Sequence, residues 1–185
     1  MNLMEQIIDD KNNKMCTRCV MDTTDPDIFF DENGICNHCH TYEHMTSRKI
    51  PTGEEGKNKL AEIANRIKEN NQNKPYDCVI GVSGGVDSTF VAYKVKEMGL
   101  RPLAVHLDNG WDSELAIKNI ENICRKLQID LHTIVLDWNE FKDLQLSFLK
   151  ASTPDSEIPS DHAIVAAMVN ASMMIGVKNI ITGYN

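Results

Sequence analysis

Two sets of residues in this sequence have types and spacing that could do chemistry, and the first is a glycine pair. Residues 83–88 read Ser-Gly-Gly-Val-Asp-Ser and stand between the apolar β-formers of residues 79–82 and apolar residues that recur at helical spacing up to Val95. The pattern predicts a strand-to-helix turn. Such a turn can bind phosphate, because glycines let successive N–H groups converge beside the positive end of a helix dipole. Ser83 and Ser88 add hydroxyl donors.

This loop fits neither of two common nucleotide-binding patterns, G-x-x-x-x-G-K-[ST] and G-x-G-x-x-G. Asp87 stands where a cation is expected. Its carboxylate would repel phosphate unless Mg²⁺ lies between them or the residue only caps the helix. A Gly-Gly turn with a Ser/Asp cap and no ligand is the alternative interpretation.

The second set is four cysteines with the spacing of a structural zinc site. Cys16 and Cys19 form one C-x₂-C pair, and Cys36 and Cys39 form another after sixteen intervening residues. Four thiolates complete the tetrahedral shell of Zn²⁺ and leave no position for a substrate water. With a turn at Asn33-Gly34, the pattern predicts a zinc ribbon that folds largely on metal binding. An iron–sulfur cluster and a redox dithiol pair are the alternatives.

The elements that position the loop follow from the hydrophobic pattern after residue 76. Strand-like and helix-like segments alternate there, which predicts an α/β domain with a parallel sheet and right-handed crossovers. The expected strands are residues 77–82, 102–108, 131–137 and 179–183, and the expected helices are residues 87–98, 112–127, 138–150 and 160–175. We expect a zinc-ribbon module in residues 1–50, a linker and helix in residues 51–75, and the α/β domain in residues 76–185, with residues 45–56 as the linker.

Charge and composition limit the classes of partner. The 185 residues carry 19 Lys and Arg against 27 Asp and Glu, and the net charge is −8. Because nucleic-acid affinity rests largely on neutralising phosphates, we expect no nucleic-acid ligand. The N-terminus shows no secretory pattern, and no apolar run approaches the roughly 20 residues of a membrane span. We therefore expect a cytoplasmic protein with reduced cysteines.

The loop sequence closely resembles the SGGxDS signature of the PP-loop ATP pyrophosphatases, the N-type enzymes that cleave ATP between its α and β phosphates. This resemblance implies a Rossmann-like domain of the adenine nucleotide alpha hydrolase type, in which the loop binds the β,γ-pyrophosphate with Mg²⁺ at Asp87. The first and fourth strands are neighbours in that family, which implies that Gly183 lies beside the loop and Asp108 nearer the nucleoside. The resemblance also implies that Ser83 and Asp87 are catalytic residues. The ATP-binding residues that it implies are Ser83, Gly84, Gly85, Val86, Asp87, Ser88, Asp108 and Gly183.

Two of these interpretations have structural alternatives. Asp108 follows a strand and could simply cap the next turn. Asp161 and His162 open a helix and could face the reacting centre, where His162 would orient substrate or move a proton. Alternatively, Ser160 is the N-cap of that helix and Asp161 is an acid of its first turn.

The cysteine module and the loop together resemble the N-acetyl sugar amidotransferases of lipopolysaccharide O-antigen and pseudaminic or legionaminic acid pathways. The resemblance covers nearly the whole chain and rests on MCTRCVMDTTDPDIFFDENGICNHCHTYE, followed by a helix and GVSGGVDST. It implies that ATP activates the acetamido oxygen of an N-acetyl sugar as an adenylate, and that ammonia displaces AMP to leave an acetamidino group. The implied partners are an N-acetylated (nucleotide) sugar and a separate glutaminase with a synthase-like companion that supplies ammonia.

Two other functions stay open. A tRNA-thiolating PP-loop enzyme would use a cysteine as sulfur carrier, yet Cys124 is the last cysteine in the sequence. A zinc-stapled module that binds ATP without turnover is the non-enzymatic alternative. Because family members generally continue beyond the position of Asn185, we also expect parts of the acceptor and ammonia sites to lie outside this chain, and we expect the chain alone to turn over poorly.

Overall fold

The computed structural model describes residues 13–183 and divides the chain into two compact units, Met1–Lys59 and Leu60–Asn185. The division falls inside a helix, whereas the sequence suggested boundaries after residues 50 and 75. The N-terminal stretch without a secretory pattern falls largely in residues 1–12, and the predicted α/β domain of residues 76–185 ends with Tyr184 and Asn185. These positions lie outside the described residues.

The cysteine-rich segment of the first unit forms two tight turns. Met15 bridges Asp22 and Phe30 bridges Cys36, each in antiparallel fashion. Gly34 has a φ of +78°, and its N–H donates to the Asp31 carbonyl at 3.0 Å, so the predicted turn at Asn33-Gly34 is confirmed.

The predicted linker at residues 45–56 is largely wrong, because two helices occupy most of it. Helix α2 spans Asn37–Lys49 and helix α3 spans Gly53–Asn70. Arg48 and Lys49 suit the last turn of α2, where the helix dipole favours cations. Pro51 then prevents continuation, and only residues 50–52 lie between the two helices.

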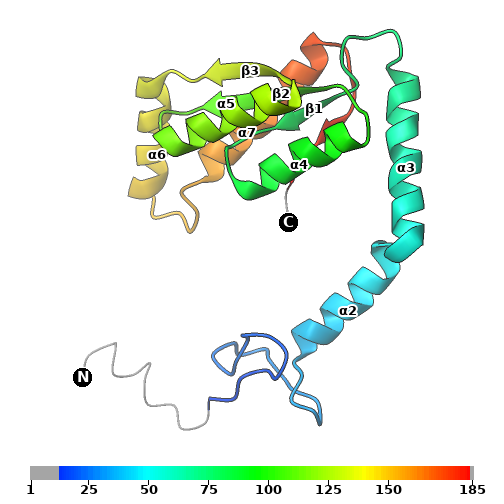
Figure 1. The fold of residues 1–185 in the computed structure, drawn as a ribbon. Coiled ribbons are helices and arrows are strands. Elements are labelled where there is room, and N and C mark those ends of the chain that lie inside the picture. The colour runs from blue at the N-terminus through cyan, green and yellow to red at the C-terminus, as the bar shows by residue number, and fades with distance from the viewer. Residues whose placement is uncertain (1–12, 184–185) are drawn as a thin grey trace. The chain divides into compact units, whose positions relative to one another are not determined.

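The second unit is built on a parallel sheet, and Figure 1 labels its strands β1, β2 and β3. Its order is β3-β2-β1-β4, and all three neighbouring pairs are parallel. The strands are β1 (Cys78–Gly81), β2 (Pro102–Asp108), β3 (Asp130–Val135) and the very short β4 (Ile180–Ile181). The predicted parallel sheet is confirmed, and β1 and β4 are neighbours. The chain order reverses between these two strands, where open α/β sheets bind ligands.

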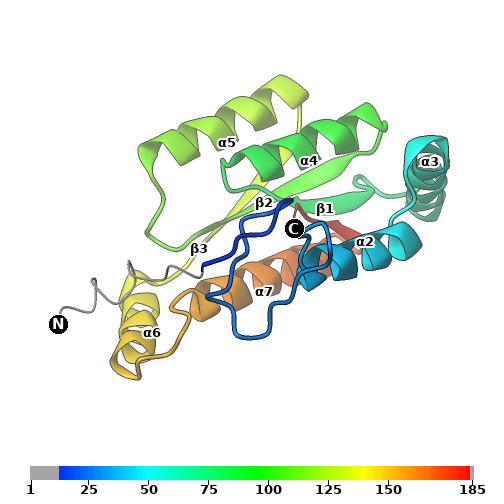
Figure 2. The same cartoon turned by 90° about the horizontal axis from the view of Figure 1, so that it is seen from below.

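Helices cover both faces of this sheet. The helices are α4 (Val86–Glu97), α5 (Glu114–Leu127), α6 (Trp138–Lys150) and α7 (Ile158–Met174). Figure 2 shows α4 and α5 on one face and α7 on the other. Because successive strand residues point to opposite faces, Ile80 packs in the core under α4 and α5, and Val79 packs in the core under α7. None of the described helices is long and apolar enough to span a membrane.

Helix α7 begins two residues earlier than predicted, and this corrects one interpretation. Glu157 is its N-cap and Pro159 lies in its first turn, where a missing N–H does no harm. Ser160 is therefore inside the helix, with only 4% of its surface exposed, and it is not the N-cap.

Candidate functional site

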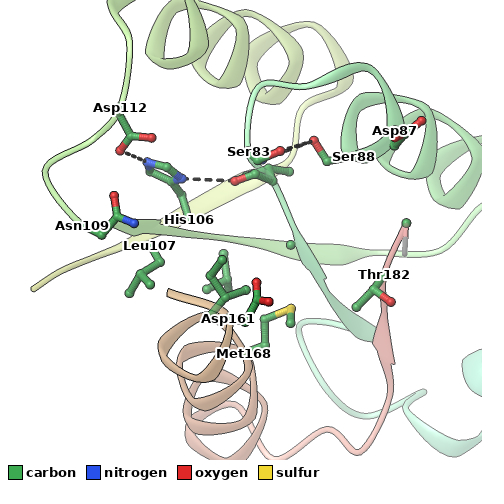
Figure 3. Close-up of a pocket in the computed structure, with 15 residues that line it drawn as sticks. Ser83, Asp87, Ser88, His106, Leu107, Asn109, Asp112, Asp161, Met168 and Thr182 are labelled. Atoms are coloured by element: carbon green, nitrogen blue, oxygen red, sulfur yellow. Dashed lines mark hydrogen bonds and ion pairs between the residues drawn. The ribbon is translucent and has the colours of Figure 1, made fainter. Parts of the chain in front are cut away.

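A cavity of about 390 Å³ opens beyond the carboxyl ends of β1, β2 and β4. Figure 3 shows side chains from four parts of the chain around it: the loop after β1, the end of β2 with its following turn, the start of α7, and the end of β4. The cavity lies at the reversal of strand order, the position that the parallel sheet predicts for a ligand.

The Ser83–Ser88 loop forms one wall and is held against α5. Gly84 has a φ of +74°, and a Cβ at this position would lie 2.8 Å from the Ala116 Cα and closer still to the Ala116 carbonyl oxygen. The Asn119 amide donates to the Gly84 carbonyl at 3.1 Å. Glycine is thus required twice over, by backbone conformation and by the close approach of α5.

The two serines of the loop bind each other across the turn. The Ser88 hydroxyl oxygen lies 3.2 Å from both the N–H and the hydroxyl of Ser83. Gly85 is the N-cap of α4 without a side-chain acceptor, and the first N–H groups of a helix have no partner within it. The loop therefore offers hydroxyl and N–H donors that an anion could use, and anion binding by its glycines stays a prediction.

The predicted loop residues divide between two surfaces. Ser83, Asp87 and Ser88 line the cavity. Gly84, Gly85 and Val86 line a second cleft of about 360 Å³ that also contains Asn119 and Lys126. Val86 is 80% exposed, so it does not contribute to the core despite its helical spacing with Val95.

Gly183 lies beside the loop, as the strand order requires. A Cβ on Gly183 would lie 3.3 Å from the Asp87 carbonyl oxygen. Gly183 and Thr182 line the same cavity as Ser83. The end of β4 and the start of α4 therefore meet at the cavity wall, where a side chain at residue 183 would be crowded.

Asp108 is the last residue of β2, as the sequence predicted, and its role toward a nucleoside stays a prediction. It does not line the cavity, and its carboxylate accepts a hydrogen bond from the Gly110 N–H at 2.9 Å. This is the turn-capping arrangement named as its alternative. On α7, the structure separates the other predicted pair, because Asp161 lines the cavity and His162 does not.

The sequence analysis missed His106, a nearly buried residue of the cavity wall. Its side chain leaves β2 between the end of β1 and Asp112 (Figure 3). The Nδ1 atom lies 3.1 Å from the Val82 carbonyl oxygen, and Nε2 lies 3.1 Å from an Asp112 carboxylate oxygen. The available signal was a lone titratable residue inside the otherwise apolar run from Pro102 to Leu107. Asn109 and Asp112 also line the cavity and were not singled out.

The four cysteines of the first unit form a cluster that can hold Zn²⁺. Their sulfur atoms all lie within 4.8 Å of one another, and those of Cys19 and Cys36 are 3.6 Å apart. A tetrahedral ion with Zn–S bonds of about 2.3 Å needs sulfurs about 3.8 Å apart. The predicted ligand set of Cys16, Cys19, Cys36 and Cys39 therefore fits zinc in donor type and spacing.

The thiols of this cluster differ in acidity. Burial raises the pKa of Cys16, but backbone N–H groups, led by that of Arg18, outweigh it and lower the pKa to about 6. Burial together with the neighbouring sulfurs raises the pKa of Cys39 to about 12. Sulfurs gathered this closely resist joint ionisation unless a cation is present, and a metal ion supplies that charge.

The histidines near this cluster have carboxylate partners instead. His38 Nε2 lies 2.7 Å from an Asp25 carboxylate oxygen, and His40 Nε2 lies 3.0 Å from one of Asp31. Both histidines are about half exposed. Neither belongs to the four-sulfur group, which leaves Cys₄ as the ligand set.

The loop, the parallel strand order and the cavity at its reversal define a PP-loop ATP pyrophosphatase fold. The family model described as queuosine biosynthesis protein QueC matches residues 77–182, more than half of the chain, and the chain belongs to this family. It is therefore a member of a group of ATP-using PP-loop enzymes.

Individual relatives agree with this assignment. The chain is 28% identical over 173 residues to an uncharacterized protein of Methanocaldococcus jannaschii, a match that covers 91% of this chain and 58% of the relative. It is 29% identical over 128 residues to the tRNA-specific 2-thiouridylase MnmA of Vesicomyosocius okutanii, with 62% of this chain and 35% of the relative covered. The chain thus spans less than two thirds of the length of these relatives.

A solved structure shows the same fold. The glutamine-dependent NAD⁺ synthetase from Acinetobacter baumannii, in complex with adenosine diphosphate, superposes with a TM-score of 0.53 at 16% identity. The match covers 68% of this chain and 24% of that chain. None of these comparisons tests the resemblance to N-acetyl sugar amidotransferases, which stays a prediction.

Proposed function

We propose that the protein is an ATP-dependent amidotransferase that adenylates the acetamido oxygen of an N-acetyl sugar and replaces it with nitrogen from ammonia. In this reaction the acetamido oxygen attacks the α-phosphorus of ATP and pyrophosphate departs. Ammonia then attacks the activated carbon, AMP leaves with the oxygen, and an acetamidino group remains. An amide carbon is a poor electrophile until its oxygen is part of a good leaving group, and AMP is such a group.

The observation that supports this proposal best is the position of the cysteines. Four of the six gather in the Cys₄ cluster. Cys78 and Cys124 are buried in the core under α4 and α5. Burial raises the pKa of Cys78 to about 12 and also raises that of Cys124. Because reactive cysteines need an accessible thiolate, the described residues supply neither a sulfur carrier nor a glutaminase nucleophile.

The positions of the residues that line the cavity suggest which of them would bind pyrophosphate, Mg²⁺ and the acceptor. Hydroxyls of Ser83 and Ser88, with N–H groups at the start of α4, would receive the departing pyrophosphate. When bound with ATP, Mg²⁺ would offset negative charge on the phosphates, and Asp87 is the residue that would hold it. A magnesium site with one or two protein carboxylates and phosphate ligands is typical of nucleotide enzymes. Asp161 and Asn109 line the opposite part of the cavity and are available to an acceptor.

Ammonia would come from a partner. No cysteine among the described residues is placed to act as a glutaminase nucleophile, and we propose that a separate glutaminase and its companion deliver ammonia to this cavity. The activity of the whole protein with its partners belongs to this proposal, because the chain spans only part of its relatives.

The proposal is tested by pyrophosphate release from the protein supplied with MgATP, ammonia and a panel of N-acetylated nucleotide sugars. We expect release that depends on both ammonia and one sugar, with a mass loss of about one unit when the acetamido oxygen becomes an imino nitrogen. Release with every acceptor omitted, or product with an unchanged mass, would contradict the amidotransferase assignment.

A tRNA-modifying reaction is the second candidate, and two comparisons favour it. The matching family is described by its part in queuosine biosynthesis, and one relative is a tRNA-specific 2-thiouridylase. The same release assay separates the candidates when unmodified tRNA and a sulfur donor replace the sugar and ammonia. Release that requires tRNA would select this second function.

A further inference from the structure

The two tryptophans of the sequence form an exposed pair next to the cavity. The ring centroids of Trp111 and Trp138 are 5.3 Å apart and their planes make an angle of 74°, an edge-to-face arrangement. Yet 64% of Trp111 and 39% of Trp138 are exposed. Because tryptophan normally buries most of its large apolar surface, an open pair of this kind is typical of a binding surface.

Trp111 stands at the rim of the cavity without lining it. Its near neighbours in the turn after β2, Asn109 and Asp112, both line the cavity, whereas Trp111 does not. Figure 3 shows Asn109 and Asp112 at the opposite end of the cavity from Asp87. The exposed indole therefore lies away from the residue proposed to hold magnesium and next to Asn109, which is available to an acceptor.

Three contacts fix Trp111 before any ligand binds. Its indole N–H donates to Gln145 Oε1 of α6 at 2.6 Å, its backbone N–H donates to Asn109 Oδ1 at 3.1 Å, and its ring packs against Trp138. Gly110 has a φ of +85°, and a Cβ there would lie 2.6 Å from Trp138 Cε3. Because the one polar atom of the indole already has a partner, the exposed surface offers apolar contact, and a fixed aromatic ring binds at low entropic cost.

We propose that Trp111 is the platform on which the sugar ring of the N-acetylated acceptor stacks, at the rim of the cavity that holds ATP. The inference rests on the proposed function and names a contact surface for its acceptor. A pyranose has a face of C–H groups, which suits an indole, and a rim of hydroxyls, which need polar partners. Within residues 13–183, one Asp112 carboxylate oxygen contacts His106 Nε2 and the other has no hydrogen-bond partner, so it can accept from such a hydroxyl.

The size of the cavity favours the acceptor over ATP as the ligand of Trp111. The volume of about 390 Å³ is near the lower end of the roughly 300 to 1,000 Å³ that hold one small ligand. ATP with its phosphates at the Ser83–Ser88 loop would occupy this space, and a second ligand then has to lie over the rim. Stacking of a base is the alternative use of an exposed indole, and it predicts that Trp111 responds to ATP alone.

The first measurement is tryptophan fluorescence, because the sequence has no tryptophan outside this pair. In Trp138→Phe, Trp111 is the only tryptophan left. We expect MgATP alone to leave its emission maximum unchanged. We expect an N-acetylated nucleotide sugar, from a panel that begins with UDP-N-acetylglucosamine, to shift the maximum to shorter wavelength in the MgATP-saturated protein, since the sugar ring displaces water from the indole.

The controls of this measurement separate the sugar from a base. A full shift with MgATP alone would overturn the proposal and assign Trp111 to adenine. An equal shift with the matching nucleoside diphosphate, which carries no sugar acceptor, would overturn it as well, because the base of that nucleotide would then lie on the indole.

The second measurement is steady-state pyrophosphate release by Trp111→Ala, Trp111→Phe and Phe90→Ala. Phe90 is the matched control, an aromatic residue of α4 that is 58% exposed and lines neither cleft. We expect the KM for the sugar to rise about tenfold in Trp111→Ala, by less than about threefold in Trp111→Phe, which keeps a ring, and not at all in Phe90→Ala. The KM for ATP should stay within about twofold in every variant. An unchanged sugar KM in Trp111→Ala, or an equal rise in the KM for ATP, would overturn the proposal.

Failure of the Trp111 platform is distinguishable from failure of the proposed function. Sugar-dependent release without an emission shift contradicts the platform alone. An emission shift by a sugar that supports no release contradicts the amidotransferase reaction and keeps the platform, and the absence of both contradicts both. If circular dichroism shows that Trp111→Ala or Trp138→Phe is unfolded, the emission of the unsubstituted protein and the sugar KM of Trp111→Phe decide the question.

Discussion

Replacing Gly84 with alanine tests whether α5 fixes the phosphate loop. Gly99 offers a matched control, because both glycines have a φ of +74° in the same unit. At either position alanine must adopt a left-handed backbone conformation, which lowers the free energy of unfolding by about 1 kcal/mol. At residue 99 the new methyl would meet only the end of the flexible Lys68 side chain, at 3.1 Å. At residue 84 it would meet the backbone of Ala116, with its Cα 2.8 Å away.

The backbone contact must be relieved by moving the loop away from α5, which costs about 1 to 3 kcal/mol more. We therefore expect unfolding free energies lowered by about 2 to 4 kcal/mol in Gly84→Ala and by about 1 kcal/mol in Gly99→Ala. Urea unfolding followed by circular dichroism measures both values. We expect MgATP affinity to fall only in Gly84→Ala. Equal losses of stability in the two variants would refute the argument that α5 holds the loop in place.

Further predictions concern the metal cluster, the magnesium position and the support of β1. Metal analysis should give about one zinc per chain, and Cys36→Ser should lower that content sharply; iron with sulfide would instead indicate a cluster of another kind. Asp87→Ala should abolish Mg²⁺-dependent ATP binding, and unchanged binding would leave Asp87 only a structural role in the first turn of α4. Asp77→Ala should lower the unfolding free energy by about 3 kcal/mol in urea titrations, because buried Asp77 accepts three hydrogen bonds from Arg101, at 2.7 to 3.1 Å.

The sheet was predictable because its strands are apolar runs separated by amphipathic helices. Every predicted strand and helix after residue 76 has a counterpart, and the parallel order follows from the crossovers. The cysteine cluster was predictable from spacing alone, since two C-x₂-C pairs impose their own geometry. Features that depend on local spacing or on hydrophobic periodicity can therefore be predicted without knowledge of tertiary contacts.

The parts that failed depend on contacts between distant residues. The helical spacing of apolar residues up to Val95 suggested a buried helix face that includes Val86, yet Val86 is exposed, and Ala92 and Val95 face the core. Asp108 and His106 are two residues apart on one strand, but only the location of β1 and of Asp112 shows which of them meets the cavity. Ser160 has the residue type of an N-cap, but α7 already begins at Ile158 and includes Pro159 in its first turn.

The two strands that bracket the cavity differ in how securely they are held. Within residues 13–183, β1 is paired on both sides and Cys78, Val79 and Ile80 are fully buried, whereas the two residues of β4 are paired with β1 alone. Amide hydrogens of β1 should exchange with solvent only when the whole unit opens. The phosphate loop is thus anchored to the slowest-opening part of the unit, so its backbone donors should stay in place while other parts of the cavity wall move.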